Sequence, residues 1–121
     1  MVKVMIVDDS RIFRKMLKAA LIETGNEVIG EAGNGTEALE LLKTCTPDLV
    51  TLDITMPVMD GIETLKEIKK ICPDQKVIMV SAAGQKDKVI EALKLDAKDF
   101  IQKPFDPDDI STVINKLFPN A

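Results

Sequence analysis

Five polar residues each follow a short apolar run, and together they could transfer a phosphoryl group. They are Asp8, Asp9, Asp53, Ser81 and Lys103. A carboxylate can act as a nucleophile and form an aspartyl-phosphate, while an ammonium group offsets charge on the transferred oxygens. A hydroxyl can donate a hydrogen bond to one of those oxygens. The set is typical of phosphoryl transfer if the fold brings its members together.

The carboxylates in this set favour a divalent cation. Acids that are held close together repel one another, and a bound cation offsets that repulsion. Hard oxygen ligands with remaining waters suit Mg²⁺ best. Asp53 follows an apolar strand end and is the best candidate for the nucleophile, whereas Asp8 and Asp9 are better placed as metal ligands. Taken singly, each residue has a structural explanation, such as an Asp pair that favours the dipole of a following helix. The prediction therefore depends on their joint placement.

The composition of the 121-residue chain excludes several other chemistries. It contains no His, so a Ser-His-Asp or Cys-His nucleophile, a His-ligated zinc and a phosphohistidine on this chain are excluded. The net charge is −4 and there is no Trp or Tyr, which argues against binding of nucleic acid. No apolar run approaches the ~18 residues of a membrane span, so we expect a cytoplasmic protein that does not bind membranes. Cys45 and Cys72 should stay reduced.

The apolar pattern alternates between short continuous runs and stripes with helical spacing, which indicates alternating strands and amphipathic helices. We predict strands near residues 4–7, 27–31, 49–52, 77–80 and 99–101. Ser10 should cap a first helix that ends at Gly25 and has this apolar face: Ile12, Phe13, Met16, Leu17, Ala20 and Leu21. A second helix should span about 36–43. The remaining helices carry three stripes, the last after Pro107: Ile62, Leu65 and Ile68; Val89, Ile90 and Leu93; Ile110, Val113, Ile114 and Leu117.

This alternation predicts an α/β fold over residues 1–121, a single domain. Right-handed crossovers place helices on both faces of a parallel sheet, which gives a three-layer sandwich. Ligands of such a doubly wound sheet bind beyond the carboxyl ends of the strands. If the first and third strands are neighbours, about 4.8 Å apart, Asp8, Asp9 and Asp53 converge on one pocket at that edge.

Four stretches of the chain resemble the receiver domain of two-component response regulators. They are Ile6-Val7-Asp8-Asp9-Ser10, the segment from Asp53 to Gly61, Val80-Ser81-Ala82-Ala83 and Lys103-Pro104-Phe105. The resemblance spans the whole chain and is greatest to single-domain chemotaxis regulators of Gram-positive and thermotogal bacteria. It implies a flavodoxin-like sheet of five strands in the order 2-1-3-4-5.

The resemblance also implies roles for the site residues. Asp53 would accept a phosphoryl group from a CheA-like histidine kinase. Asp9 would bind Mg²⁺ directly, Asp8 often through water, and the backbone carbonyl of Thr55 would supply another ligand. Lys103 would pair with the phosphoryl group, and the peptide bond that follows it is expected to be cis.

A switch follows from the same resemblance. Phosphate on the acceptor would draw the Ser81 hydroxyl and its loop inward, and Phe100 would turn into the gap that the loop leaves. The partner surface would contain Phe100, Val89, Val113 and Lys116, although Val89 and Val113 fit a core position equally well. We expect a monomer that binds a flagellar switch protein and a chemotaxis-type phosphatase. It would be a signalling protein and not an enzyme, although it assists its own phosphorylation and autodephosphorylation.

Three positions depart from the commonest pattern of this family. Phe100 lacks the hydroxyl of a frequent tyrosine. Asp96 stands where a glycine usually ends a helix, so a left-handed backbone is expected there at a small cost in stability. Thr55 and Ala83, at positions that tune phosphate loss, carry neither an acid nor an amide. We therefore expect no strong side-chain assistance to an attacking water.

Three alternatives share parts of this pattern. A single-domain phosphorelay intermediate would have the same site. A Mg²⁺-dependent aspartyl-phosphate phosphohydrolase of the haloacid-dehalogenase kind needs a second acid two residues after its nucleophile, where this chain has Thr55. A flavodoxin-like electron carrier would share the fold but would leave the acid cluster unexplained.

Overall fold

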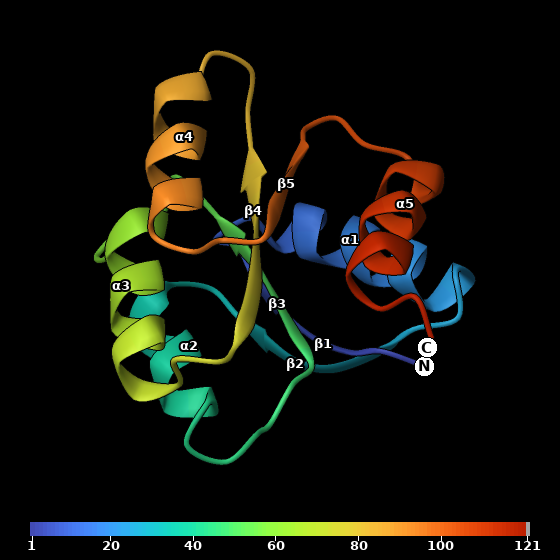
Figure 1. Cartoon of the computed structure of the whole chain (residues 1–121), viewed down its shortest axis with the longest axis horizontal. Coiled ribbons are helices and arrows are strands. Elements are labelled where there is room, and N and C mark those ends of the chain that lie inside the picture. Colours follow the sequence, from blue (N-terminus) through green and yellow to red (C-terminus); the bar gives the residue numbers. More distant parts are fainter. Residues whose placement is uncertain (121) are drawn as a thin grey trace.

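The computed structural model describes residues 1–120, in which a parallel sheet is covered by helices on both faces (Figure 1). Strands and helices alternate along the chain: β1 (Lys3–Val7), α1 (Arg11–Glu23), β2 (Glu27–Ala32), α2 (Gly35–Leu41), β3 (Leu49–Asp53), α3 (Gly61–Ile71), β4 (Lys76–Ser81), α4 (Lys86–Lys94), β5 (Asp99–Gln102) and α5 (Pro107–Leu117). Within residues 1–120 the five strands run parallel in the order β2-β1-β3-β4-β5. The predicted fold class and strand order are confirmed. None of the helices in this part of the chain is long and apolar enough to cross a membrane.

The two faces of the sheet have separate cores. α1 and α5 cover one face, and α2, α3 and α4 cover the other (Figure 1). Alternate side chains of a strand point to opposite faces. Along β1, Val4 and Ile6 therefore join the core beneath α1 and α5, whereas Met5 and Val7 join the core on the other side. β3 lies in the middle of the sheet and is buried along its whole length, up to and including Asp53.

Side-chain caps fix where the helices next to the strand ends begin. The Ser10 hydroxyl accepts the backbone N–H of Phe13 at 3.2 Å, which confirms the predicted start of α1. Asp60 caps α3 in the same way. Asp106 caps α5 through a reciprocal pair of bonds with Asp109, just before Pro107 in the first turn. Because α1 and α3 start a few residues after β1 and β3, their caps fix the loops that carry the predicted site residues.

Some predicted apolar stripes are wider than the faces that the helices bury. Ile12 and Met16 of α1 are 72% and 51% exposed, and Ile90 and Leu93 of α4 are about two-fifths exposed. The physical reason is that α1 buries only a narrow face, formed by Leu17, Ala20 and Leu21. The predicted boundaries differ from the observed ones by one or two residues, most clearly at α2, which begins at Gly35 and ends at Leu41.

Two non-glycine residues among residues 1–120 adopt a left-handed backbone. Asp96 has φ 76° after the end of α4, as its position predicts, and Val58 has φ 72° in the loop between β3 and α3. A β-branched residue rarely adopts this conformation. Val58 therefore marks local backbone strain in the loop that follows Asp53.

Candidate functional site

Three carboxylates meet at the carboxyl edge of the sheet. One carboxylate oxygen from each of Asp8, Asp9 and Asp53 lies within 4.8 Å of the other two. β1 and β3 are paired so that Val7 lies opposite Leu52, which places the next residue of each segment, Asp8 and Asp53, side by side. Asp8 and Asp53 are buried, whereas Asp9 is exposed. The structure thus brings Asp8 and Asp9 together with Asp53, which lies far from them in the sequence.

Hydrogen bonds fix the turn that carries Asp8. Its Oδ1 accepts the backbone N–H of Ser10 at 2.8 Å, and its backbone carbonyl accepts a bond from Arg14 Nη1 at 2.5 Å. The backbone N–H of Asp8 donates to the carbonyl of Ala32 at the end of β2 at 3.0 Å. The Arg14 side chain also reaches Glu31, with 3.4 Å between Nε and Oε1. The Asp8 carboxylate is therefore held in one orientation before any ligand binds.

Lys103 adds the positive charge that the sequence predicts. Its Nζ lies 3.0 Å from Asp8 Oδ2 and 3.6 Å from Asp53 Oδ1. Its backbone N–H donates to the carbonyl of Ser81 at 2.7 Å, and the Lys103–Pro104 peptide bond is cis, as expected. In the structure Lys103 pairs more closely with Asp8 than with the predicted acceptor.

The electrostatics of the cluster suit a divalent cation. Burial raises the pKa of Asp53 from its ordinary value of 3.8 to about 6, and the negative charges of Asp8 and Asp9 act in the same direction. The ammonium group of Lys103 lowers this pKa and offsets part of the rise. Three carboxylates with a single lysine leave an excess of negative charge, and all the donors are hard oxygens. This donor set fits Mg²⁺.

The loops after β3 and β4 are joined by a residue that the sequence did not indicate. Gln85 Nε2 donates to the hydroxyl of Thr55 at 2.6 Å, and Gln85 Oε1 accepts the backbone N–H of Ala82 at 2.7 Å. A side-chain amide thus reaches Thr55 from elsewhere in the chain, although neither Thr55 nor Ala83 carries one. In the sequence, only the polar side chain of Gln85 after Gly84 hinted at a hydrogen bond, and nothing there identified Thr55 as its partner.

Ser81 is the last residue of β4 and is buried beside β5, where it pairs with Gln102. A cavity of about 270 Å³ adjoins it, and the lining includes Gln85, Val89 and Phe100. Phe100 is 40% exposed and also borders the neighbouring hollow toward α5. The loop that follows Ser81 lines this cavity, so side chains there have space to move.

The predicted partner surface divides into buried and exposed residues. Val89 and Val113 are buried, which is the alternative that their helical stripes left open. Lys116 is exposed and its Nζ lies 3.3 Å from Asp99 Oδ2. In this conformation only Phe100 and Lys116 of the four present substantial surface to a partner.

Known proteins resemble this chain over nearly its whole length. Residues 4–115 match the family described as response regulator receiver domain. The chemotaxis protein CheY of Thermotoga maritima is 53% identical over 115 residues, which cover 95% of this chain and 96% of that protein. The chemotaxis protein CheY of Bacillus subtilis is 52% identical over 114 residues, with coverage of 94% and 95%.

Solved structures show the same likeness in three dimensions. A chain in the crystal structure of the CheX–CheY–BeF3–Mg²⁺ complex from Borrelia burgdorferi has a TM-score of 0.91 at 39% identity, covering 97% of this chain and 89% of that one. A receiver domain from Clostridium thermocellum has a TM-score of 0.90 at 34% identity, with coverage of 98% and 95%. Sequence and fold therefore indicate the same relatives.

Proposed function

Because this chain belongs to the family of response regulator receiver domains, we propose that it is a phosphorylation-activated switch of a two-component system, with Asp53 as the residue that accepts the phosphoryl group. The observation that carries the proposal is the meeting of Asp8, Asp9 and Asp53 with Lys103 at one edge of the sheet. Asp53 ends the central, fully buried strand and its Oδ1 lies 3.6 Å from Lys103 Nζ, so a group bound to Asp53 would lie beside the lysine.

Asp8, Asp9 and Asp53 would hold Mg²⁺, together with the backbone carbonyl of Thr55. When bound, the cation offsets negative charge on the oxygens of the transferring group. The substitution Asp9→Ala should weaken Mg²⁺ affinity greatly while the fold persists, because Asp9 is exposed and supports no strand. Unchanged affinity, measured by calorimetry, would show that Asp9 is not a ligand.

The transfer itself needs a nucleophile and a way to neutralise charge. With a pKa of about 6, Asp53 is mainly ionised at neutral pH, and one of its oxygens can attack phosphorus in a phosphohistidine. The new bond is O–P, the bond that breaks is P–N, and the electron pair leaves with the imidazole of the kinase. Lys103 pairs with one phosphoryl oxygen, and the Ser81 hydroxyl donates to another after its loop moves inward.

Movement of that loop would carry the signal. The cavity behind Ser81 can accept the Phe100 ring, which already borders it. The surface around α4, β5 and α5 would then change shape, and Phe100 and Lys116 would contact a partner, joined by Val89 and Val113 only if the change exposes them. The likeness to chemotaxis proteins supports a CheA-like histidine kinase as donor, with a flagellar switch protein and a phosphatase as partners.

The acceptor can be tested with acetyl phosphate and Mg²⁺, followed by mass spectrometry of the intact protein. Wild type should gain the mass of one phosphoryl group, and Asp53→Asn should gain none. Asp96→Asn is the matched control, because Asp96 also contacts lysines but lies outside the cluster. A mass gain that persists in Asp53→Asn would reject Asp53 as the acceptor.

The chemotaxis role needs a separate test. Beryllofluoride imitates a phosphoryl group on a carboxylate, so the affinity for a peptide from a flagellar switch protein should rise when beryllofluoride and Mg²⁺ are added. Fluorescence anisotropy of a labelled peptide measures this change. Equal affinity in both states would argue against the chemotaxis role and leave phosphorylation at Asp53 untouched.

A further inference from the structure

The ammonium group of Lys103 faces an aromatic ring as well as two carboxylates. Its Nζ lies 4.0 Å from the centroid of the Phe13 ring, in addition to its contacts with Asp8 and Asp53. The lysine side chain is only 17% exposed, so little water reaches it. A cation over the face of a ring is attracted by the ring quadrupole, and the attraction grows when water is excluded.

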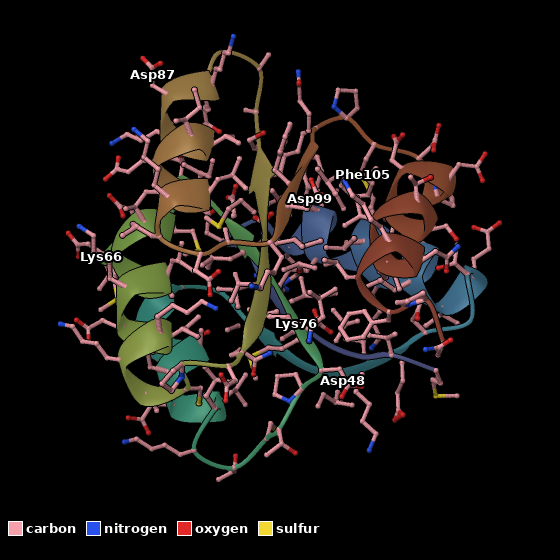
Figure 2. All side chains as sticks on the ribbon, in the orientation of Figure 1. Asp48, Lys66, Lys76, Asp87, Asp99 and Phe105 are labelled. Atoms are coloured by element: carbon pink, nitrogen blue, oxygen red, sulfur yellow. The ribbon has the colours of Figure 1, made fainter. Side chains whose placement is uncertain are left out.

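Phe13 is itself fixed on two sides. Its backbone N–H donates to the Ser10 hydroxyl, and the backbone N–H of Ser10 donates to Asp8 Oδ1. Its ring packs against Phe105 at 5.7 Å between centroids, with the planes inclined by 58°. Phe105 follows Lys103 by two residues and lies on the side of the sheet covered by α1 and α5 (Figure 2). The ring therefore joins the first turn of α1 to the segment that carries the lysine.

We propose that Phe13 is a positioning residue that holds the Lys103 ammonium at the phosphorylation site by a cation–π contact. The inference rests on the proposed function, in which Lys103 pairs with a phosphoryl group on Asp53. Nothing in the sequence pairs Phe13 with Lys103, because they lie in distant segments and Phe13 reads as part of an apolar helical face.

The ring supplies something that the carboxylates cannot. In the structure Lys103 Nζ lies 3.0 Å from Asp8 Oδ2 and 3.6 Å from Asp53 Oδ1, so both carboxylates attract the ammonium group. The charges around the ammonium change when Asp53 is phosphorylated, whereas the face of the ring does not. Phe13 can thus keep the ammonium desolvated and near the edge of the sheet while its charged partners are exchanged.

Fluorination of the Phe13 ring tests this inference, because each fluorine weakens the quadrupole and changes the size of the ring little. Site-specific incorporation of mono-, di- and trifluorophenylalanine at position 13 should slow phosphorylation by acetyl phosphate in steps. The total loss should be about threefold to tenfold, the range expected for a partly desolvated cation–π contact. Phe13→Leu should show a similar loss of rate. Phe13→Trp should keep the wild-type rate, since indole binds cations more strongly than the other aromatic rings.

The chain contains a matched control pair. Lys76 Nζ lies 5.4 Å from the centroid of the Phe118 ring at the opposite end of the sheet, and the same fluorinated series at Phe118 should leave the rate unchanged. Urea unfolding of every variant shows whether the fold is retained. Ring-current shifts of the Lys103 ε-protons, lost in Phe13→Leu, report the contact in solution.

The outcomes separate this inference from the proposed function. A wild-type chain that takes no phosphate on Asp53 would overturn the proposed function and, with it, the role given to Phe13. Wild-type phosphorylation with a flat rate across the fluorinated Phe13 series would overturn only the role of Phe13. An equal decline in the Phe118 series would overturn it too, because the loss would then not come from the contact with Lys103.

Discussion

Asp53 and Asp96 are both carboxylates that contact lysines, yet the fold shifts their pKa values in opposite directions. Burial raises the pKa of Asp53 to about 6 even though Lys103 lies beside it. Hydrogen bonds from Lys98 and then Lys69, at 3.0 and 3.1 Å, lower the pKa of Asp96. The Asp96 side chain is 58% exposed and lies just before the amino end of β5.

The difference between these two carboxylates shows that depth of burial, more than a neighbouring lysine, decides the direction in which the pKa shifts. At the carboxyl edge two buried acids share one lysine, and removal from water costs more than the lysine restores. At the amino end of the sheet, where Asp48 and Lys76 are labelled in Figure 2, charged residues stay in contact with water. Exposed ion pairs of this kind contribute little to stability.

The largest effect should come from crowding the backbone beneath the buried acid. A Cβ on Gly61 would overlap the carbonyl oxygen of Asp53 and lie 2.7 Å from Ile54 Cα. Gly61→Ala should therefore lower the free energy of unfolding by about 3 kcal/mol, because backbone on both sides must shift. Urea denaturation measures this loss.

Gly25 is the control for that variant at the other end of the molecule. It has φ +87° and a Cβ there would meet no atom within 4 Å, so Gly25→Ala should cost roughly 1 kcal/mol through backbone strain alone. If Gly61→Ala costs less than Gly25→Ala, the carboxyl edge is not fixed by close packing.

The next effect concerns the charge on Asp53. Because its pKa is 3.8 ordinarily and about 6 in the fold, the native state binds more protons than the unfolded chain between these values, and stability falls as pH rises through them. Above pH 6 the penalty is fully present, so Asp53→Asn should stabilise the protein by about 2 to 3 kcal/mol at pH 7. Below pH 4 the gain should vanish.

Asp96→Asn should behave in the opposite way. A lowered pKa contributes stability above the ordinary value of 3.8, and this contribution is lost as the pH falls below that value. Urea unfolding of both variants at pH 3 and pH 7 gives the comparison directly. A destabilised Asp53→Asn at pH 7 would mean that Lys103 compensates fully for burial.

The smallest effect should come from the backbone of Asp96. Its φ of 76° favours glycine, and relief of this strain in Asp96→Gly opposes the loss of two exposed ion pairs. The free energy of unfolding should change by less than about 1 kcal/mol. A thermal melt that reveals a large loss would show that the two lysine contacts stabilise the end of α4 far more than exposed pairs usually do.

Most of the fold could be predicted from periodicity, because each strand and helix has a local apolar pattern. The errors lie where a pattern does not say how much of a face will be covered. Ile12 and Met16 continue the stripe of α1 but extend beyond the surface that the sheet and α5 offer. The placement of the acids, of Ser81 and of Lys103 at the carboxyl edge of the sheet was predicted, because each lies at or just after the end of a strand. Gln85 and Phe13 were missed because their partners come from other loops.

The sequence by itself determined the types of residue available, the absence of any His, the order of the elements and the placement of acids at or directly after the ends of strands. Only the tertiary structure decided how deeply each acid is buried, which carboxylate Lys103 prefers and which ring it faces. Local chemistry fixes what one segment can form, since a strand or helix depends on neighbours along the chain. Desolvation and contacts between loops depend instead on several elements packed together, and no single segment encodes them.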